Sequence, residues 1–140
     1  MILKKALYKG ENKMEQGNKG DSPKPIRTFR DLLIWQKAIL LAKTVYQITA
    51  VFPSDERFGL TLQVRRAAVS ISSNIAEGHA RTGRHFAHFL SIARGSTSEV
   101  ESQLFLAAEL GFVTAQAIDS TLSIAGEIHR MTASLIEKLS

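Results

Sequence analysis

The chain has 140 residues, and its 18 Lys and Arg against 13 Asp and Glu give a net charge of +5, a size that fits one domain with a buried core. It contains no cysteine, which excludes a disulfide framework and cysteine metal sites. No apolar run approaches the ~20 residues of a membrane span, and the first residues lack the apolar stretch of a secretory signal, so a cytoplasmic protein is expected.

Residues 1–27 are expected to form a disordered basic tail. Lys, Gly, Asn and Pro dominate this segment, and apolar periodicity is nearly absent from it. Residues 1–30 hold eight Lys or Arg against three acidic residues, so the net positive charge of the chain resides there. Met14 offers an alternative start, which would remove part of this excess. The folded domain is expected to comprise residues 28–140.

The first helix is expected from about Thr28 to Phe52. The Thr28 hydroxyl can cap it, and Asp31 lies in the first turn, where a negative charge is favourable. Its apolar positions are spaced three and four apart, as a buried helix face requires: Ile34, Ala38, Leu41, Val45, Ile48 and Phe52. Pro53 cannot continue the helix and ends it.

The second helix is expected to follow Ser54 as its cap, with Asp55 and Glu56 in the first turn and Gly78 as its C-terminal cap. At 100° per residue, the run from Gly59 to Gly78 carries a polar line between two apolar flanks. The polar line comprises Gly59, Gln63, Arg66, Ser70, Asn74 and Glu77. One flank comprises Leu60, Val64, Ala67, Ala68, Ile71 and Ile75, and the other Phe58, Leu62, Val69 and Ala76. Two apolar flanks exceed what one neighbour can cover, which favours a bundle and an assembly.

The third helix is expected from about Gly83 to Leu110, ended by Gly111, and the fourth from about Ala115 to Leu139, capped by Thr114. Four amphipathic helices of roughly 24 residues joined by short loops predict an all-α, up-down-up-down antiparallel four-helix bundle with a flexible N-terminal tail.

Charge is unevenly distributed within the domain. Between positions 57 and 94 there are six arginines and one acidic residue, whereas between 99 and 137 six acidic residues face one arginine. The basic segment and the acidic segment can neutralise each other across helices or subunits. Alternatively, the arginines can form a surface for nucleic acid. The candidate phosphate-binding residues are Arg65, Arg66, Arg84 and Arg94, because the guanidinium fork suits phosphate.

Polar side chains on the second and third helices can pair. We expect Arg66 to pair with Glu101, and Glu77 with Arg94 or Arg84. In a structural interpretation, a polar network sets helix register and subunit geometry; its members are Gln63, Arg66, Ser70, Asn74, Glu77 and Glu101.

The histidines do not form a complete metal site. His85 and His88 lie one turn apart, and Glu77 or His79 could join them, but the ligand set is incomplete; no metal or cofactor is expected. His129 lies within the apolar stripe of the fourth helix, where a hydrogen-bonded histidine is expected.

The spacing of Arg81 and His88 is similar to the Arg-x6-His motif of HEPN ribonucleases, although Thr82 replaces the polar residue usual after that arginine. Fingerprints of other catalytic classes are absent, so a non-enzymatic protein is favoured and the ribonuclease remains a remote alternative.

Two motifs, RRAxxSIxxNIAEG from Arg65 to Gly78 and ARGSxxE from Ala93 to Glu99, carry a resemblance that extends over about residues 28–139. Further matching pairs are Trp35-Gln36, Phe52-Pro53, Phe89-Leu90 and Leu110-Gly111. Together they resemble the bacterial four-helix-bundle family encoded in intervening sequences of 23S rRNA genes. The resemblance implies a ring-like homopentamer and RNA or nucleic-acid binding, because a related branch is an accessory subunit of a reverse transcriptase. A structural scaffold without nucleic-acid affinity is the alternative.

Overall fold

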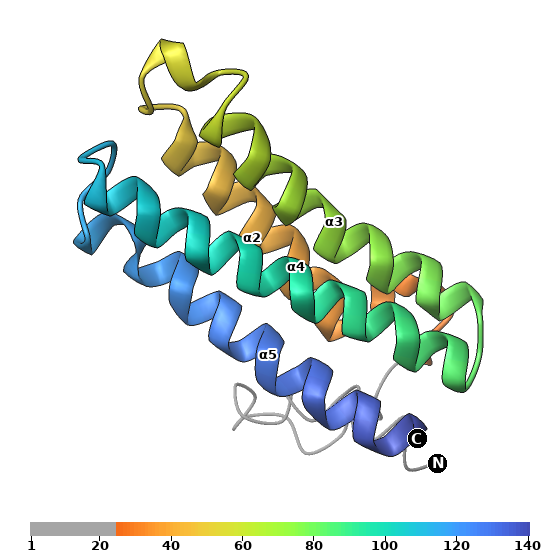
Figure 1. The fold of residues 1–140 in the computed structure, drawn as a ribbon. Helices are drawn as coiled ribbons and strands as arrows, with labels where there is room; N and C mark the ends of the chain where they lie inside the picture. Colours follow the sequence, from red (N-terminus) through yellow and green to blue (C-terminus); the bar gives the residue numbers. More distant parts are fainter. Residues whose placement is uncertain (1–24) are drawn as a thin grey trace.

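The computed structural model describes residues 25–140, and this part of the chain forms four long antiparallel helices and three short 3-10 turns with no strand (Figure 1). The long helices are α2 (Leu33–Thr49), α3 (Leu60–Ala80), α4 (Arg84–Glu109) and α5 (Asp119–Leu139). The turns are η2 (Phe29–Asp31), η3 (Ser54–Glu56) and η4 (Gln116–Ile118). The predicted all-α, up-down-up-down bundle is confirmed. The predicted tail lies almost entirely outside the described residues, as does Met14.

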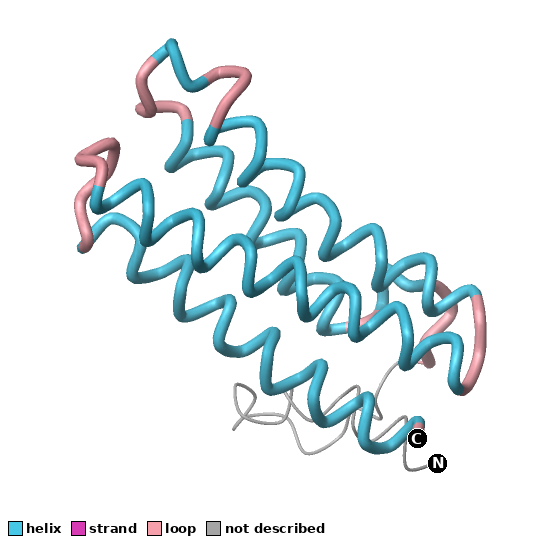
Figure 2. Tube along the Cα trace, viewed as in Figure 1, coloured by secondary structure: helices cyan, strands magenta, loops and turns pink. Residues whose placement is uncertain are grey.

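Each helix packs against its two neighbours in the bundle. α2 contacts α3 and α5, α4 contacts the same two helices, and the α3–α4 contact is the most extensive. Short connections join successive helices, so neighbours in sequence are neighbours in space (Figure 2). The hairpin of α3 and α4 is therefore the most tightly coupled pair of elements.

The N-terminal cap forms as predicted, but the helix that follows is interrupted. The Thr28 hydroxyl accepts from the Arg30 N–H at 3.2 Å, and Asp31 Oδ2 accepts from the Thr28 N–H at 3.0 Å, which makes a capping box. Leu32 is then extended, with a ψ of 126°, and fully buried. This break turns Leu32 into the core, so α2 begins at Leu33 rather than Thr28.

The second predicted helix begins later than its sequence signals suggest. Ser54 to Glu56 form a separate 3-10 turn after Pro53, and α3 begins at Leu60. Glu56 Oε2 accepts from the Leu60 N–H at 2.9 Å, so it satisfies one of the free donors at the start of α3. Glu56 thus stabilises the start of α3 from the preceding turn, and the predicted cap by Ser54 is not formed.

Gly111 ends α4 as predicted. Its φ of +78° is the left-handed conformation that favours glycine. The Phe112 N–H donates to the Ala107 carbonyl at 3.0 Å, as in a Schellman motif. The Thr114 hydroxyl accepts from the Ala117 N–H at 3.1 Å, but this contact precedes the separate turn η4, and α5 begins at Asp119 rather than at Ala115.

The prediction that Gly78 caps α3 is wrong. The helix continues to Ala80, and Gly78 is buried inside it. A Cβ at this position would lie 2.7 Å from the Phe89 Cβ and 2.9 Å from Phe86 Cδ2. Gly78 is therefore present because α4 crosses it closely, not because the chain turns there.

The core is formed by the apolar faces predicted for the four helices. The largest fully buried side chains come from all of them: Ile34, Leu41, Ile71, Ile75, Leu90, Leu104 and Ile128. Thr97 and Thr132 are also fully buried, and their hydroxyls donate to the carbonyls of Ala93 and Ile128, both at 2.8 Å. These two buried hydroxyl groups are thus satisfied within their own helices. Among the described residues, no helix combines the length and hydropathy needed to cross a membrane.

Candidate nucleic-acid interface on the α3–α4 hairpin

Close helix packing and a tight turn position the side chains of the hairpin. Gly78 lets α4 approach α3, and Gly83, with a φ of +60°, reverses the chain just before α4. Neither position tolerates a side chain freely, because one lacks space and the other has left-handed backbone. The packing of α3 on α4 therefore sets the relative positions of the backbone segments that carry the arginines.

Three of the candidate arginines are exposed and have no acidic partner in the described part of the chain. Arg66, Arg84 and Arg94 all lie at the surface, and none forms an ion pair within residues 25–140. Arg81, by contrast, lies 3.6 Å from Glu77, and its guanidinium lies 5.2 Å from the centre of the Phe89 ring. The unpaired guanidinium groups can donate to an anionic partner.

Arg65, the fourth candidate, makes contacts within the protein that the sequence did not reveal. Its Nε donates to Thr49 Oγ1 at 2.8 Å, and its guanidinium lies 4.5 Å from the centre of the Tyr46 ring. Thr49 is buried and donates in turn to the Val45 carbonyl at 2.8 Å. Arg65 therefore joins α3 to α2. The one sequence feature that pointed to this contact was the position of Arg65 off the polar line of α3.

A polar groove lies between α3 and α4. Its volume is about 410 Å³, and it is lined by Gln63, Arg66, Ala67, Ser70, Ser96, Glu99 and Gln103. Across it the hydroxyls of Ser70 and Ser96 are hydrogen bonded at 2.9 Å. Asn74 Nδ2 donates to the Ser70 carbonyl at 2.7 Å and to its hydroxyl at 3.0 Å. The structure therefore brings together four members of the predicted polar network.

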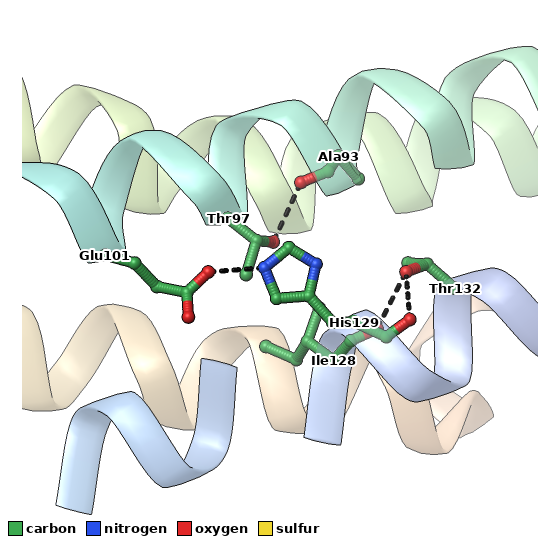
Figure 3. A network of polar contacts seen from close by, with 6 residues as sticks. All are labelled: Ala93, Thr97, Glu101, Ile128, His129 and Thr132. Carbon is green, nitrogen blue, oxygen red and sulfur yellow. Dashed lines mark hydrogen bonds and ion pairs between the residues drawn. The ribbon is translucent and has the colours of Figure 1, made fainter. Parts of the chain in front are cut away.

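The expected ion pairs of this network are wrong. Glu101 is hydrogen bonded to His129 on α5 rather than to Arg66, as Figure 3 shows, and Glu77 pairs with Arg81 rather than with Arg94 or Arg84. The physical reason is the helical angle, because Glu99 and Gln103 of α4 line the groove beside α3, whereas Glu101 lies on the α5 side. The prediction that His129 is hydrogen bonded is confirmed.

The other histidines do not come together in one site. His85 and His88 are exposed, His79 packs edge-on against Phe86, and the His88 ring meets Phe89 at 5.7 Å. Within residues 25–140, no group of three or more His, Asp or Glu side chains is arranged to hold a metal ion. Arg81 of the Arg-x6-His spacing is already engaged by Glu77 and Phe89.

Comparison with known proteins identifies the family. The chain matches the family model described as 23S rRNA-intervening sequence protein over residues 30–134. The chain belongs to this family. A crystal structure of a protein of unknown function, from the S23 ribosomal protein family of Bacteroides thetaiotaomicron, is similar to it with a TM-score of 0.67. That likeness covers 74% of this chain and 98% of the other at 24% identity, and it supports the fold. A search of the curated proteins found no match.

The two motifs that resemble 23S rRNA-intervening sequence proteins meet in space. Arg66 and Ser70, from the α3 motif, line the same groove as Ser96 and Glu99, from the α4 motif. The Ser70–Ser96 hydrogen bond joins the motifs directly. Each motif therefore contributes residues to the same groove of the hairpin.

Proposed function

We propose that this protein is a non-enzymatic, self-assembling four-helix bundle that binds RNA through the arginines of its α3–α4 hairpin. The observation that carries the proposal is the exposure of Arg66, Arg84 and Arg94 on one hairpin without ion pairs inside the described chain. Structural arginines are commonly held by carboxylates, whereas phosphate-binding arginines must be free to donate. The membership in the 23S rRNA-intervening sequence family supports RNA as the nucleic acid.

Self-assembly is supported by apolar surface that the bundle leaves uncovered. On the α2–α3 face, Tyr46 is 47% exposed and Val69 44% exposed, and both line a shallow, mainly apolar depression of the surface. On α4, Phe105, Leu106 and Leu110 are also exposed. Two different apolar patches on one chain suit head-to-tail contacts between copies, and such contacts close into a ring when the rotation permits. The homopentamer implied by the family resemblance is a ring of this kind.

The test compares two triple variants of equal charge. Arg66→Ala, Arg84→Ala and Arg94→Ala are combined in one protein. The control combines Arg30→Ala, Arg130→Ala and Lys138→Ala, which are all exposed and outside the hairpin. Affinity for single-stranded RNA is measured by fluorescence anisotropy, and the oligomeric mass by light scattering. The proposal expects the hairpin variant to lose at least about tenfold in affinity with the assembly intact, and the control to change much less.

Other outcomes separate the alternatives. If wild-type protein binds no RNA while assembling normally, the protein is a scaffold and the RNA proposal is wrong. If incubation cleaves RNA and His88→Ala abolishes cleavage, the non-enzymatic assignment is wrong and the ribonuclease alternative is correct. The ion pair of Arg81 with Glu77 favours the non-enzymatic assignment, because it leaves that arginine less available to a scissile phosphate.

A further inference from the structure

The exposed apolar surface of α2 and α3, here called the α2–α3 patch, carries a positive charge. It is a shallow depression lined by Ile39, Ala42, Lys43, Tyr46, Gln47 and Val69. Lys43 is exposed, and it forms no ion pair within residues 25–140. Its ammonium group therefore lies at the edge of apolar surface with no counter-charge in the described part of the chain.

A second exposed apolar surface, the α4 patch, lies near the C-terminal end of α4 and carries a negative charge. Its apolar side chains are Phe105, Leu106 and Leu110, each about half exposed. Glu109 follows Phe105 by four residues and Leu106 by three, so it shares their face of the helix. The Glu109 carboxylate is exposed and has no ion pair among the described residues. The two patches are thus apolar surfaces with opposite charges.

One copy of the chain cannot bring its own two patches together. Both α2 and α4 pack against α3 and α5, so α2 and α4 lie at diagonal corners of the bundle (Figure 1). The hydrophobic core separates them, and the exposed side chains of α4 point away from it. Each patch therefore needs a surface from another molecule to cover it.

Charge distinguishes the surfaces that could cover the α2–α3 patch. If two such patches met, two Lys43 side chains would lie close together, beside the Arg65 guanidinium that covers Tyr46 in each copy. Residues 1–24 contain six lysines against three acidic residues, so they would also bring positive charge to it. The α4 patch is apolar and brings the Glu109 carboxylate instead. Complementary charges favour this contact over both others, because like charges are costly at an interface.

We propose that the α2–α3 patch of one copy binds the α4 patch of a second copy, with Lys43 of the first paired with Glu109 of the second. The inference rests on the proposed self-assembly and specifies the surfaces that meet. Because the two surfaces differ, the contact is heterologous: each added copy presents a further free patch, so the contact generates rings or filaments rather than twofold dimers.

The direct test mixes two full-length variants that each lack one patch. Val69→Lys places a charge in the α2–α3 patch and leaves the α4 patch intact, whereas Leu106→Lys does the reverse; both positions are exposed. Each variant alone is expected to be monomeric by light scattering, with the circular dichroism of the wild type. Their equimolar mixture is expected to form a dimer of one copy of each and to grow no further. Ser134→Lys, exposed on α5, is the matched control and should assemble like the wild type.

Charge reversal tests the predicted ion pair. Lys43→Glu brings a second carboxylate to Glu109, and Glu109→Lys brings a second ammonium group to Lys43. Each is expected to raise the protein concentration needed for assembly by about tenfold. The variant with both changes restores opposite charges and is expected to assemble at nearly the wild-type concentration. Lys138→Glu and Glu137→Lys, exposed on α5, make the same charge changes outside both patches and should have little effect.

Several results would overturn the inference. A dimer formed by Leu106→Lys alone would indicate a symmetric contact between two α2–α3 patches. Wild-type mass in both lysine variants would place the interface elsewhere, and a mixture that stays monomeric would show that the two patches do not bind each other. Failure of the double charge reversal to restore assembly would exclude the pair of Lys43 with Glu109. A wild-type protein that is monomeric at every concentration, in contrast, would overturn the proposed self-assembly itself.

Discussion

Two glycines inside helices are expected to respond in opposite ways to the same substitution. Gly95→Ala on α4 places a Cβ where no atom of another element lies within 4 Å. Gly78→Ala on α3 places it 2.7 Å from the Phe89 Cβ. Because Phe89 Cβ is attached directly to the backbone of α4, it cannot rotate away, and the two helices must separate.

The magnitudes follow from helix propensity and packing. Alanine is better than glycine in a helix interior by about 1 kcal/mol, so Gly95→Ala is expected to stabilise the fold by roughly that amount. Gly78→Ala has the same gain in helix propensity, but the overpacked contact between its Cβ and α4 costs about 1–3 kcal/mol. The two variants should therefore differ by about 1–3 kcal/mol in the free energy of unfolding, with Gly78→Ala the less stable.

Urea and thermal unfolding followed by circular dichroism measure this difference. For a domain of this size, 1 kcal/mol corresponds to roughly 4 °C in Tm. Measurements at several protein concentrations separate the stability of the fold from that of an assembly. If Gly78→Ala unfolds at the same temperature as Gly95→Ala or above it, the close α3–α4 crossing does not constrain position 78, and the explanation of this glycine is wrong.

Three further predictions concern other parts of the bundle. Arg65→Ala should destabilise the protein by about 1–2 kcal/mol because its contacts with Thr49 and Tyr46 are lost. Unfolding of Arg65→Ala, Tyr46→Leu and the double variant should show that the two substitutions are energetically coupled. Additive effects on the free energy of unfolding would contradict the contact. The N–H groups of Arg27 and Thr28 donate to the Asp31 carboxylate and hold its pKa below the ordinary 3.8, so the carboxylate stabilises the fold above that pH. The difference in Tm between wild type and Asp31→Ala should be constant above about pH 5 and should shrink as the pH falls below 3.8, whereas a constant difference would refute the capping role. Val69→Lys should reduce the oligomeric mass measured by light scattering, and Ser134→Lys, exposed on α5, should not; equal masses for both variants would exclude the α2–α3 face from the interface.

The sequence predicts features that arise within a few residues of one another. Gly111 ends α4 for a local reason, so that boundary is found where it was expected, whereas α2 ends at Thr49, three residues before the predicted end at Phe52 and Pro53. The capping box at Thr28 also depends on residues three apart. The apolar faces of the helices follow from helical periodicity, which is why the core and the bundle were predictable.

The features that sequence reasoning missed depend on which helices become neighbours and at what angle. Gly78 has the local signature of a helix end, but its role is set by α4, which crosses it. The partner of Glu101 is His129 from α5 because position 101 faces that helix. An ion pair joins α2 to α5, with Lys37 Nζ 2.8 Å from Glu127 Oε2. The two residues are too far apart in the sequence for a local pattern to predict that they pair.

The contact of Arg65 with Tyr46 and Thr49 has the same origin. An arginine at the edge of an apolar flank can reach phosphate or a neighbouring helix, and only the position of α2 decides between them. The groove itself could be predicted only in part. Its α3 residues belong to the predicted polar line, but their meeting with Ser96, Glu99 and Gln103 of α4 depends on the register of α3 against α4.

The salt dependence of RNA affinity tests the central claim most directly. Each phosphate contact with a single strand contributes about −0.7 to the slope of log affinity against log salt concentration. The variant that combines Arg66→Ala, Arg84→Ala and Arg94→Ala should therefore have a slope shallower than that of the wild type by about 2, with an unchanged oligomeric mass. A slope and an affinity equal to those of the wild type would contradict the assignment of the RNA-binding surface to the α3–α4 hairpin.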